Sequence, residues 1–401
     1  MLKDVRYNYF VILIILSNIV YFLWLIKLLN DFPWRYVFSD WIINYHGGYI
    51  RRGFLGEISI FLSNNLSINI KYIFFIIHLF IYTCFHVTFY KFFNVFKKNY
   101  VFYFICFSPL IFLYPISIFE SFARKEIFYI TFFLTNCYIS LKISNRKIIF
   151  FTTNLFVIFS YLIHESFVFF IGFFYLSYLV FLKKNKYKIN LYEIVLIIFV
   201  YIILFYLLLI PVTEDKISEM VLYINENFYK ITESSGAISW LNRSASSSLL
   251  FLKVNNISFK HLTQNILYLH FYFIFFYILY KEKIFLSDKF YSFLIFAVFL
   301  SPLFLFFIGN DWGRFVYIIY NFCLIFTFYC LYDKKEIFLG IDKLTKISKI
   351  NINLKYLLTI GYLSLWTPKL FFYDNVVLFP LFILLKDLIK YTFKYTQLIL
   401  F

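Results

Sequence analysis

Charged residues are scarce in this chain. They make up 15% of its 401 residues, whereas hydrophobic residues make up 62%. Globular domains carry about 25% charged residues, so this chain has too few charges to cover a surface that faces water. The composition therefore predicts an integral membrane protein rather than a soluble domain.

Cysteines and nucleotide-binding motifs are also few or missing. The five cysteines are Cys84, Cys106, Cys137, Cys323 and Cys330. All of them lie in apolar runs and their number is odd, which argues against a disulfide framework or a CxxC-type metal site. The sequence has no P-loop, GxGxxG or HExxH signature. We therefore expect no cofactor, no metal site and no nucleotide-driven chemistry.

Long apolar runs dominate what is present. A helix needs about 20 apolar residues to cross a bilayer, and hydropathy marks about twelve candidate stretches whose ends are not sharply defined. These stretches cover residues 9–29, 70–90, 100–118, 127–141, 148–163, 166–182, 191–210, 263–280, 290–308, 315–332, 355–372 and 375–393. The sequence thus predicts one all-α membrane domain, residues 1–401, built as a polytopic bundle of transmembrane helices.

The basic residues predict the orientation of this bundle. They are concentrated in every second connection, for example at Lys97–Lys98 and in residues 183–188. The positive-inside rule assigns such connections to the cytoplasm, together with both chain termini. The net charge of +17 is then an orientation signal, and we expect no nucleic acid partner.

The remaining connections fall on the opposite side of the membrane. They include a first loop at residues 31–69 and one long loop at residues 212–262. In the first loop, apolar residues recur at helical spacing and predict a short helix lying on the membrane surface. The abundance of Lys, Asn, Ile, Phe and Tyr is typical of an AT-rich bacterial genome. We therefore expect the bacterial inner membrane, with these loops in the periplasm.

Four polar clusters, far apart in the sequence, share this outer face. They are DWIINYHGGYIRRGFLGE at Asp40–Glu57, ESFARKE at Glu120–Glu126, the pair His164–Glu165, and GNDWGR at Gly309–Arg314. Their meeting on one face is the strongest functional signal in the chain.

The arginines in these clusters are candidate ligands for phosphate, because a guanidinium binds phosphate through two parallel hydrogen bonds. The candidates are Arg51, Arg52, Arg124 and Arg314, with Asp311, Glu57 and Lys125 in supporting roles. Three alternatives stay open. Arg51 and Arg52 could extend to lipid head groups, and Asp311 could form only a local ion pair with Arg314. Arg124 and Lys125 could belong to an outer loop whose charges compensate each other.

Three residues are candidates for proton transfer. Glu165 and His164 interrupt an apolar run of 35 residues, at a short turn that holds them near the membrane surface, where a carboxylate or imidazole can act as a general base. Asp40 is a further candidate base or anchor. The alternative for His164 and Glu165 is a cap of the helical hairpin.

The run NYHGGYIRRGFLGE, with the HE pair and DWGR, resembles the O-antigen or capsule repeat-unit polymerases of the Wzy type. The resemblance implies a polytopic inner-membrane enzyme. Members of that family transfer a growing glycan from undecaprenyl diphosphate onto an incoming lipid-linked repeat unit, with periplasmic arginines important. Arg51, Arg52 and Arg314 would hold those roles here, and Glu165 or His164 would transfer the proton. Membrane lipid and a chain-length regulator are further expected partners.

Two other functions fit the same clusters. Glycosyltransferases of the C-type membrane fold use polyprenyl-phosphate sugars and carry a catalytic acid in the first outer loop, where Asp40 lies, although no DxD pair is present here. A transporter or flippase for lipid-linked sugars is the second alternative. It would require charged groups through the depth of the spans, and few are found there.

Overall fold

A computed structural model describes residues 2–33, 36–96, 105, 108–117, 121–242, 273–280, 289–309, 311–333, 361, 366–367, 377–378, 386 and 389. The α-helices are α1 (Leu2–Asn30), α2 (Tyr36–Trp41), α3 (Phe54–Leu66), α4 (Ile70–Phe93), α6 (Leu113–Ser117), α7 (Glu126–Ser140), α8 (Arg146–Ile163), α9 (Ile171–Lys184), α10 (Leu191–Leu209), α11 (Glu214–Asn227), α14 (Lys289–Leu300), α15 (Leu305–Ile308) and α16 (Trp312–Cys330). Short 3₁₀ helices are η1 (Asn94–Phe96), η3 (Glu165–Phe170), η4 (Ile238–Trp240) and η5 (Ser301–Phe304).

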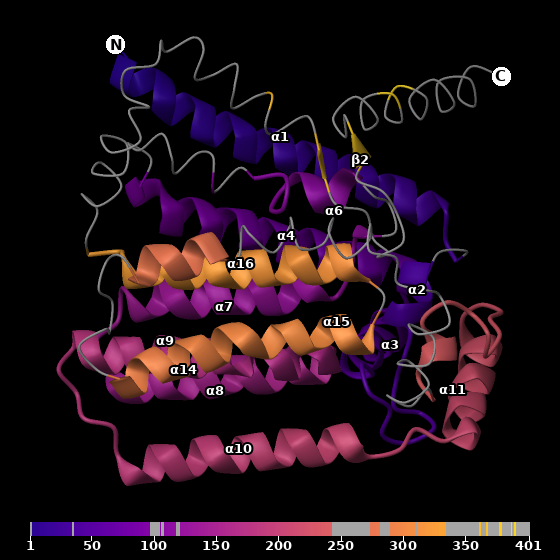
Figure 1. Cartoon of the computed structure of the whole chain (residues 1–401). Coiled ribbons are helices and arrows are strands. Elements are labelled where there is room, and N and C mark those ends of the chain that lie inside the picture. The colour runs from indigo at the N-terminus through magenta and orange to yellow at the C-terminus, as the bar shows by residue number, and fades with distance from the viewer. Residues whose placement is uncertain are drawn as a thin grey trace.

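The long helices lie side by side in a bundle, with α7 in its interior (Figure 1). Helix α7 packs against α4, α8, α9 and α16, and α4 in turn packs against α1. The short helices α2 and α3 and the helix α11 gather at one end of this bundle, opposite the end where α1 begins (Figure 1). Charged side chains of several connections therefore meet at that end.

Asparagine side chains define the starts of three long helices. Asn69 accepts a hydrogen bond from Lys71 N, and Asn145 accepts from Lys147 N and Ile148 N. Asn190 forms a reciprocal capping box with Glu193 at the start of α10. Each cap satisfies backbone N–H groups that have no partner within the helix, which fixes where these apolar segments begin.

Among the described residues, six helical stretches are long and apolar enough to cross a membrane. Two of them differ in an informative way. Of the most apolar 18 residues in α16, 94% are buried, whereas in α10, the more hydrophobic of the two, 11% are buried. An exposed helix that is more apolar than a buried one is typical of a protein whose surroundings are lipid.

Most of the predicted stretches coincide with observed helices. The overlapping predictions are 9–29, 70–90, 127–141, 148–163, 166–182, 191–210, 290–308 and 315–332, which match α1, α4, α7, α8, η3–α9, α10, α14–α15 and α16. The predictions 100–118 and 263–280 lie in part outside the described residues. The helical character of the bundle is thus confirmed, while twelve spans and the sidedness of the termini stay predictions.

The last two predicted spans, 355–372 and 375–393, lie almost entirely outside the described residues. Four positions within them form an antiparallel strand pair instead, β1 (Trp366–Thr367) with β2 (Val377–Leu378), in which Trp366 pairs with Leu378. The sequence gives a reason for this departure at β1. Thr367 precedes Pro368, and a residue before proline avoids the helical conformation.

The helix predicted after Arg52 is present as α3, and its small residues are buried together with Leu55 and Ile60. Gly56, Ser59 and Ser63 are buried, whereas Phe61 is 64% exposed. A Cβ atom on Gly56 would lie 2.0 Å from the carbonyl oxygen of Ile43, so only glycine fits at this contact. The small-residue face holds α3 against the first connection, and the large apolar residue points outward.

The long loop is ordered over its described part, residues 212–242, and covers the first connection. Helix α11 buries Ile217, Met220, Val221 and Ile224, and the Tyr223 ring stacks on His46 with centroids 3.9 Å apart. The backbone N–H of Ala237 donates to Ser39 Oγ over 2.9 Å. The rest of the predicted loop, residues 243–262, lies outside the described residues.

Candidate functional site

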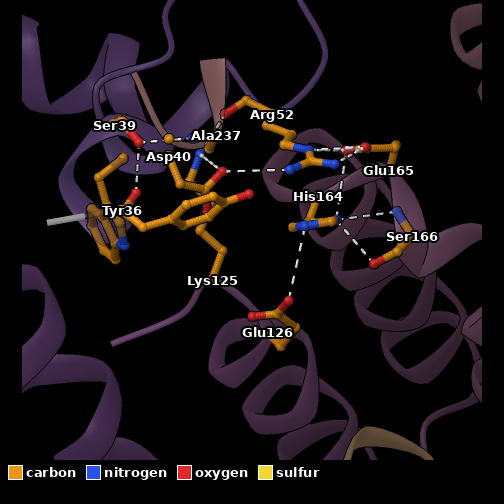
Figure 2. A network of polar contacts seen from close by, with 12 residues as sticks. Tyr36, Ser39, Asp40, Arg52, Lys125, Glu126, His164, Glu165, Ser166 and Ala237 are labelled. Carbon is orange, nitrogen blue, oxygen red and sulfur yellow. Dashed lines mark hydrogen bonds and ion pairs between the residues drawn. The ribbon is translucent and has the colours of Figure 1, made fainter. Parts of the chain in front are cut away.

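Polar and charged side chains from five places in the chain meet at the end of the bundle that carries α2 and α3 (Figure 2). We call the following set the polar cluster: Asp40, Arg52, Lys125, Glu126, His164, Glu165 and Arg314. They come from the end of α2, the turn before α3, the start of α7, the junction of α8 and η3, and the first turn of α16. The predicted convergence of distant polar segments is therefore seen in the fold.

Arg52 forms the strongest pair in the polar cluster. Its Nε lies 2.7 Å from Glu165 Oε2, and its Nη2 lies within hydrogen-bonding distance of Glu165 Oε1. The Arg52 backbone is left-handed, with φ of 68°, and Lys125 Nζ donates to its carbonyl oxygen over 2.8 Å. An unusual backbone conformation that is held by a buried lysine aims this guanidinium at the carboxylate.

Asp40 lies on the other side of Arg52. Its side chain is buried, and its Oδ1 is 3.7 Å from Arg52 Nη1 and 3.9 Å from Lys125 Nζ. Burial tends to raise the pKa of this carboxyl, but Lys125 and Arg52 outweigh it and hold the pKa below its ordinary value. Burial also lowers the pKa of Lys125 to about 8, with Asp40 opposing that change.

The turn before α7 fixes the positions of Arg124, Lys125 and Glu126. The carbonyl oxygen of Ala123 accepts a hydrogen bond from Trp41 Nε1 over 3.0 Å and contacts His78 Nε2 at 2.7 Å. Ala123 itself is left-handed, with φ of 57°. Of the three charged residues after it, Arg124 and Lys125 contact the first connection, whereas Glu126 faces His164 and Arg314.

His164 sits between two carboxylates. Its Nδ1 accepts from the backbone N–H of Ser166 at 3.2 Å and contacts Ser166 Oγ at 2.9 Å. Its Nε2 lies 3.9 Å from Glu126 Oε1. Burial, followed by the charge of Arg52, lowers the pKa of His164 to about 4, so the imidazole is neutral at pH 7.

Arg314 connects α16 to the polar cluster. Its Nη1 lies 3.1 Å from Glu126 Oε1, and its Nη2 lies 2.7 Å from Asp311 Oδ2. Beside this pair is a small cavity of about 10 Å³, room for about one water molecule. Tyr82, Tyr114, Ser121, Arg124, Glu126, Arg314 and Tyr317 are among its lining residues.

The structure brings most of the predicted site residues together, but three of them have other partners. Arg51 Nη2 donates to the carbonyl oxygen of Leu241 over 2.7 Å, and Glu57 accepts from Tyr45 N over 3.0 Å. The Arg124 guanidinium lies over the Tyr36 ring, 4.3 Å from its centroid. Arg51 and Glu57 thus stabilise the first connection and its contact with the long loop.

Two expectations for the acids need refinement. Glu165, the leading candidate base, has both oxygens engaged by Arg52, so in this arrangement it stays ionised and positions the guanidinium. Asp311 and Arg314 do form the local ion pair that was the alternative, yet Arg314 also reaches Glu126.

Glu126 is a member of the polar cluster that the sequence did not single out. It closes the ESFARKE segment and begins the apolar run of α7. An acid at the first position of an apolar helix was the sequence feature that could have identified Glu126 as a candidate. Its neighbours Arg124 and Lys125 were considered only as cations for phosphate.

Comparison of the chain with protein-family models, curated proteins and solved structures finds no match. The described residues contain no group of three or more His, Cys, Asp or Glu side chains placed to hold a metal ion. What the polar cluster offers chemically is a set of cations that can stabilise an anionic group, next to carboxylates that can accept a proton.

Proposed function

We propose that this chain is a bacterial inner-membrane polysaccharide polymerase. It transfers a growing glycan from undecaprenyl diphosphate onto a lipid-linked repeat unit at the periplasmic face. The observation that supports this most is the polar cluster itself. Arg52, Lys125 and Arg314 converge with three buried or half-buried carboxylates at one end of a bundle of apolar helices.

The proposed roles follow from the charge that develops during transfer. As the bond between the anomeric carbon and the diphosphate breaks, negative charge grows on the leaving oxygen, and Arg52, Arg314 and Lys125 stabilise it. A carboxylate of the polar cluster accepts the proton of the attacking hydroxyl. The guanidinium groups are already oriented by Glu165 and Asp311, so they need little rearrangement when the substrate arrives.

The membrane setting suits this substrate. A polyprenyl tail stays in the bilayer, so the enzyme needs no soluble nucleotide-binding domain. Outward-facing helices such as α10, with Phe199 at 56% and Ile202 at 61% exposure, would face the lipid acyl chains. Undecaprenyl diphosphate, membrane lipid and a chain-length regulator are the proposed partners.

A second candidate is a C-type transferase that takes a polyprenyl-phosphate sugar. The observation that favours it is Asp40, a buried acid near the end of the short helix α2, in the connection between α1 and α4, and 3.9 Å from a buried lysine. In that reading Asp40 is the catalytic acid or base. The polymerase and the C-type transferase would use the same cations and carboxylates. The two functions differ in the glycan that is transferred.

The surface glycolipid of a deletion strain separates the candidates. The polymerase predicts lipid cores that carry one repeat unit, restored to long chains by the wild-type gene. A strain that makes no complete repeat unit indicates the single-sugar transferase instead. Accumulation of finished repeat unit on the cytoplasmic face indicates a flippase, and an unchanged chain-length pattern rules out all three.

A further inference from the structure

Glu126 is the most poorly satisfied acid in the polar cluster. Its side chain is 2% exposed, and neither carboxylate oxygen takes part in a hydrogen bond of ordinary geometry within the described chain. Leaving a buried polar group without such partners costs about 1–3 kcal/mol, more for a charged group. A structural acid would have its oxygens occupied, so this arrangement points to an acid that exchanges a proton.

The hydrogen bonds of His164 fix its tautomer. A backbone N–H can only donate, so the bond from Ser166 N to Nδ1 requires that Nδ1 carry a lone pair. The neutral ring therefore has its proton on Nε2. That N–H points toward Glu126 Oε1, 3.9 Å away, and it cannot accept a proton from a substrate. His164 is consequently a donor toward Glu126 and not a base.

The other acids of the polar cluster are less suited to accept a proton. Both oxygens of Glu165 receive hydrogen bonds from Arg52. Asp40 lies between two cations, Arg52 and Lys125, which weaken its basicity. Glu126 pairs with Arg314, which also pairs with Asp311. Against the effect of burial, Arg314, His164 and Arg124 hold the pKa of Glu126 below its ordinary value as well, but neither of its oxygens is held in the two-pronged contact that Glu165 makes.

Glu126 also has space beside it. It lines the small cavity together with Arg124, Arg314, Ser121 and Tyr114. Two guanidinium groups and a carboxylate on one cavity wall place a proton acceptor next to groups that bind an anion. A hydroxyl that entered this space would lie beside the Glu126 carboxylate, whose Oε2 has no hydrogen bond within the described chain.

We infer that Glu126 is the proton acceptor of the transfer reaction and that His164 is a positioning residue that acts through it. This inference rests on the proposed function. In the step, the acceptor hydroxyl oxygen bonds to the anomeric carbon of the donor glycan and its proton passes to Glu126. The carbon–oxygen bond to undecaprenyl diphosphate breaks, and that leaving group keeps the electron pair, held by the cations of the polar cluster.

Transfer assays on the full chain in nanodiscs test the roles, with radiolabelled undecaprenyl-diphosphate repeat unit from the producing strain as substrate. Glu126→Gln should lower kcat about 100-fold or more with little change in KM. His164→Gln places an amide N–H near the position of Nε2 and should retain most activity, whereas His164→Asn, whose shorter amide cannot reach that position, should lose it. Full activity in Glu126→Gln, or equal loss in both His164 variants, overturns the inference.

A second measurement does not depend on the reaction. In protein labelled with ¹⁵N-histidine, the resonances missing from His164→Gln identify His164. They should report a neutral ring protonated at Nε2 at pH 7, and Glu126→Gln should shift the Nε2 resonance more than the Nδ1 resonance. A ring protonated at Nδ1 refutes the inference even if the enzyme is active. If the wild-type protein shows a ring protonated at Nε2 but has no transferase activity, the proposed function is refuted. The geometry of His164 and Glu126 is then still supported.

Discussion

The two ends of α8 carry two ionic clusters that are built differently. At its first residue, Arg146 pairs with Glu193 of α10 through Nε–Oε1 at 2.6 Å and a second contact, Nη2–Oε2. Tyr178 donates to the same carboxylate over 2.7 Å, and Asn190 N donates to it over 3.2 Å. We call these four residues the Arg146 cluster. Both oxygens of its carboxylate are occupied.

The polar cluster at the other end of α8 leaves several buried atoms without hydrogen bonds. In the described chain these include Asp40 Oδ1, both oxygens of Glu126, His164 Nε2 and Arg314 Nε. Both clusters contain an arginine that grips a glutamate through two nitrogens, so the pair alone does not separate a structural cluster from a functional one. The buried atoms without hydrogen bonds around the pair distinguish the two clusters, because such atoms do not stabilise the fold.

The largest expected difference between the clusters is in catalysis. Arg52→Lys should lower the rate of glycan transfer by about 100-fold or more, because an ammonium cannot reproduce the planar, two-pronged contact that stabilises developing charge. The matched variant Arg146→Lys should stay within about twofold of the wild type. Initial rates per amount of folded protein measure both. Equal losses would mean that the two clusters do not differ in function.

A smaller effect is expected from pH. Because burial lowers the pKa of Lys125 to about 8, the polar cluster loses a positive charge as pH rises through that value, and transfer should decline several-fold between pH 7 and 9. Unfolding does not explain such a decline. The unfolded chain keeps the lysine protonated up to about pH 10.4, so this group stabilises the folded state more as pH rises.

A pH–rate profile with unfolding midpoints measured over the same range checks this expectation. A rate that stays constant to pH 10 would show that the charge of Lys125 is not needed. If the unfolding midpoint fell together with the rate, the decline would come from unfolding and not from loss of the Lys125 charge.

The smallest effect on activity is expected at the Arg146 cluster. Glu193→Gln keeps the shape of the side chain and removes its charge, so it weakens the attachment of α10 by about 1–2 kcal/mol while transfer per folded molecule stays constant. Thermal unfolding in detergent measures the first quantity and the nanodisc assay the second. Loss of activity without loss of stability would extend the functional site to this end of α8.

Much of the bundle could be predicted because apolar runs of helical length leave few alternatives in lipid. The runs that became α4, α8, α10 and α16 needed only length and hydropathy. The strand pair at Trp366–Thr367 was missed because hydropathy takes no account of the proline that follows. Which side of α3 meets the rest of the protein was not predicted, because that contact depends on a carbonyl group, Ile43 O, that no periodicity reveals.

The membership of the polar cluster was partly predictable for a different reason. Alternation of spans placed distant segments on one face, which was enough to bring Arg52, Glu165 and Arg314 into one hypothesis. It could not supply the pairing of Arg52 with Glu165, which are 113 positions apart, since that depends on how α3 packs against α8. Nor could it show that Arg51 donates to Leu241 O or that Glu126 Oε2 has no hydrogen bond within the described chain.

Gly56 restricts which substitutions the first connection can tolerate. Since α3 touches Ile43 at backbone distance, any larger side chain there would push the helix outward and carry Arg52 away from its carboxylate. Phe61, five positions along the same helix, is under no such constraint. Sequence variation in this helix should therefore be wide on its exposed side and nearly absent at its glycine and serine positions.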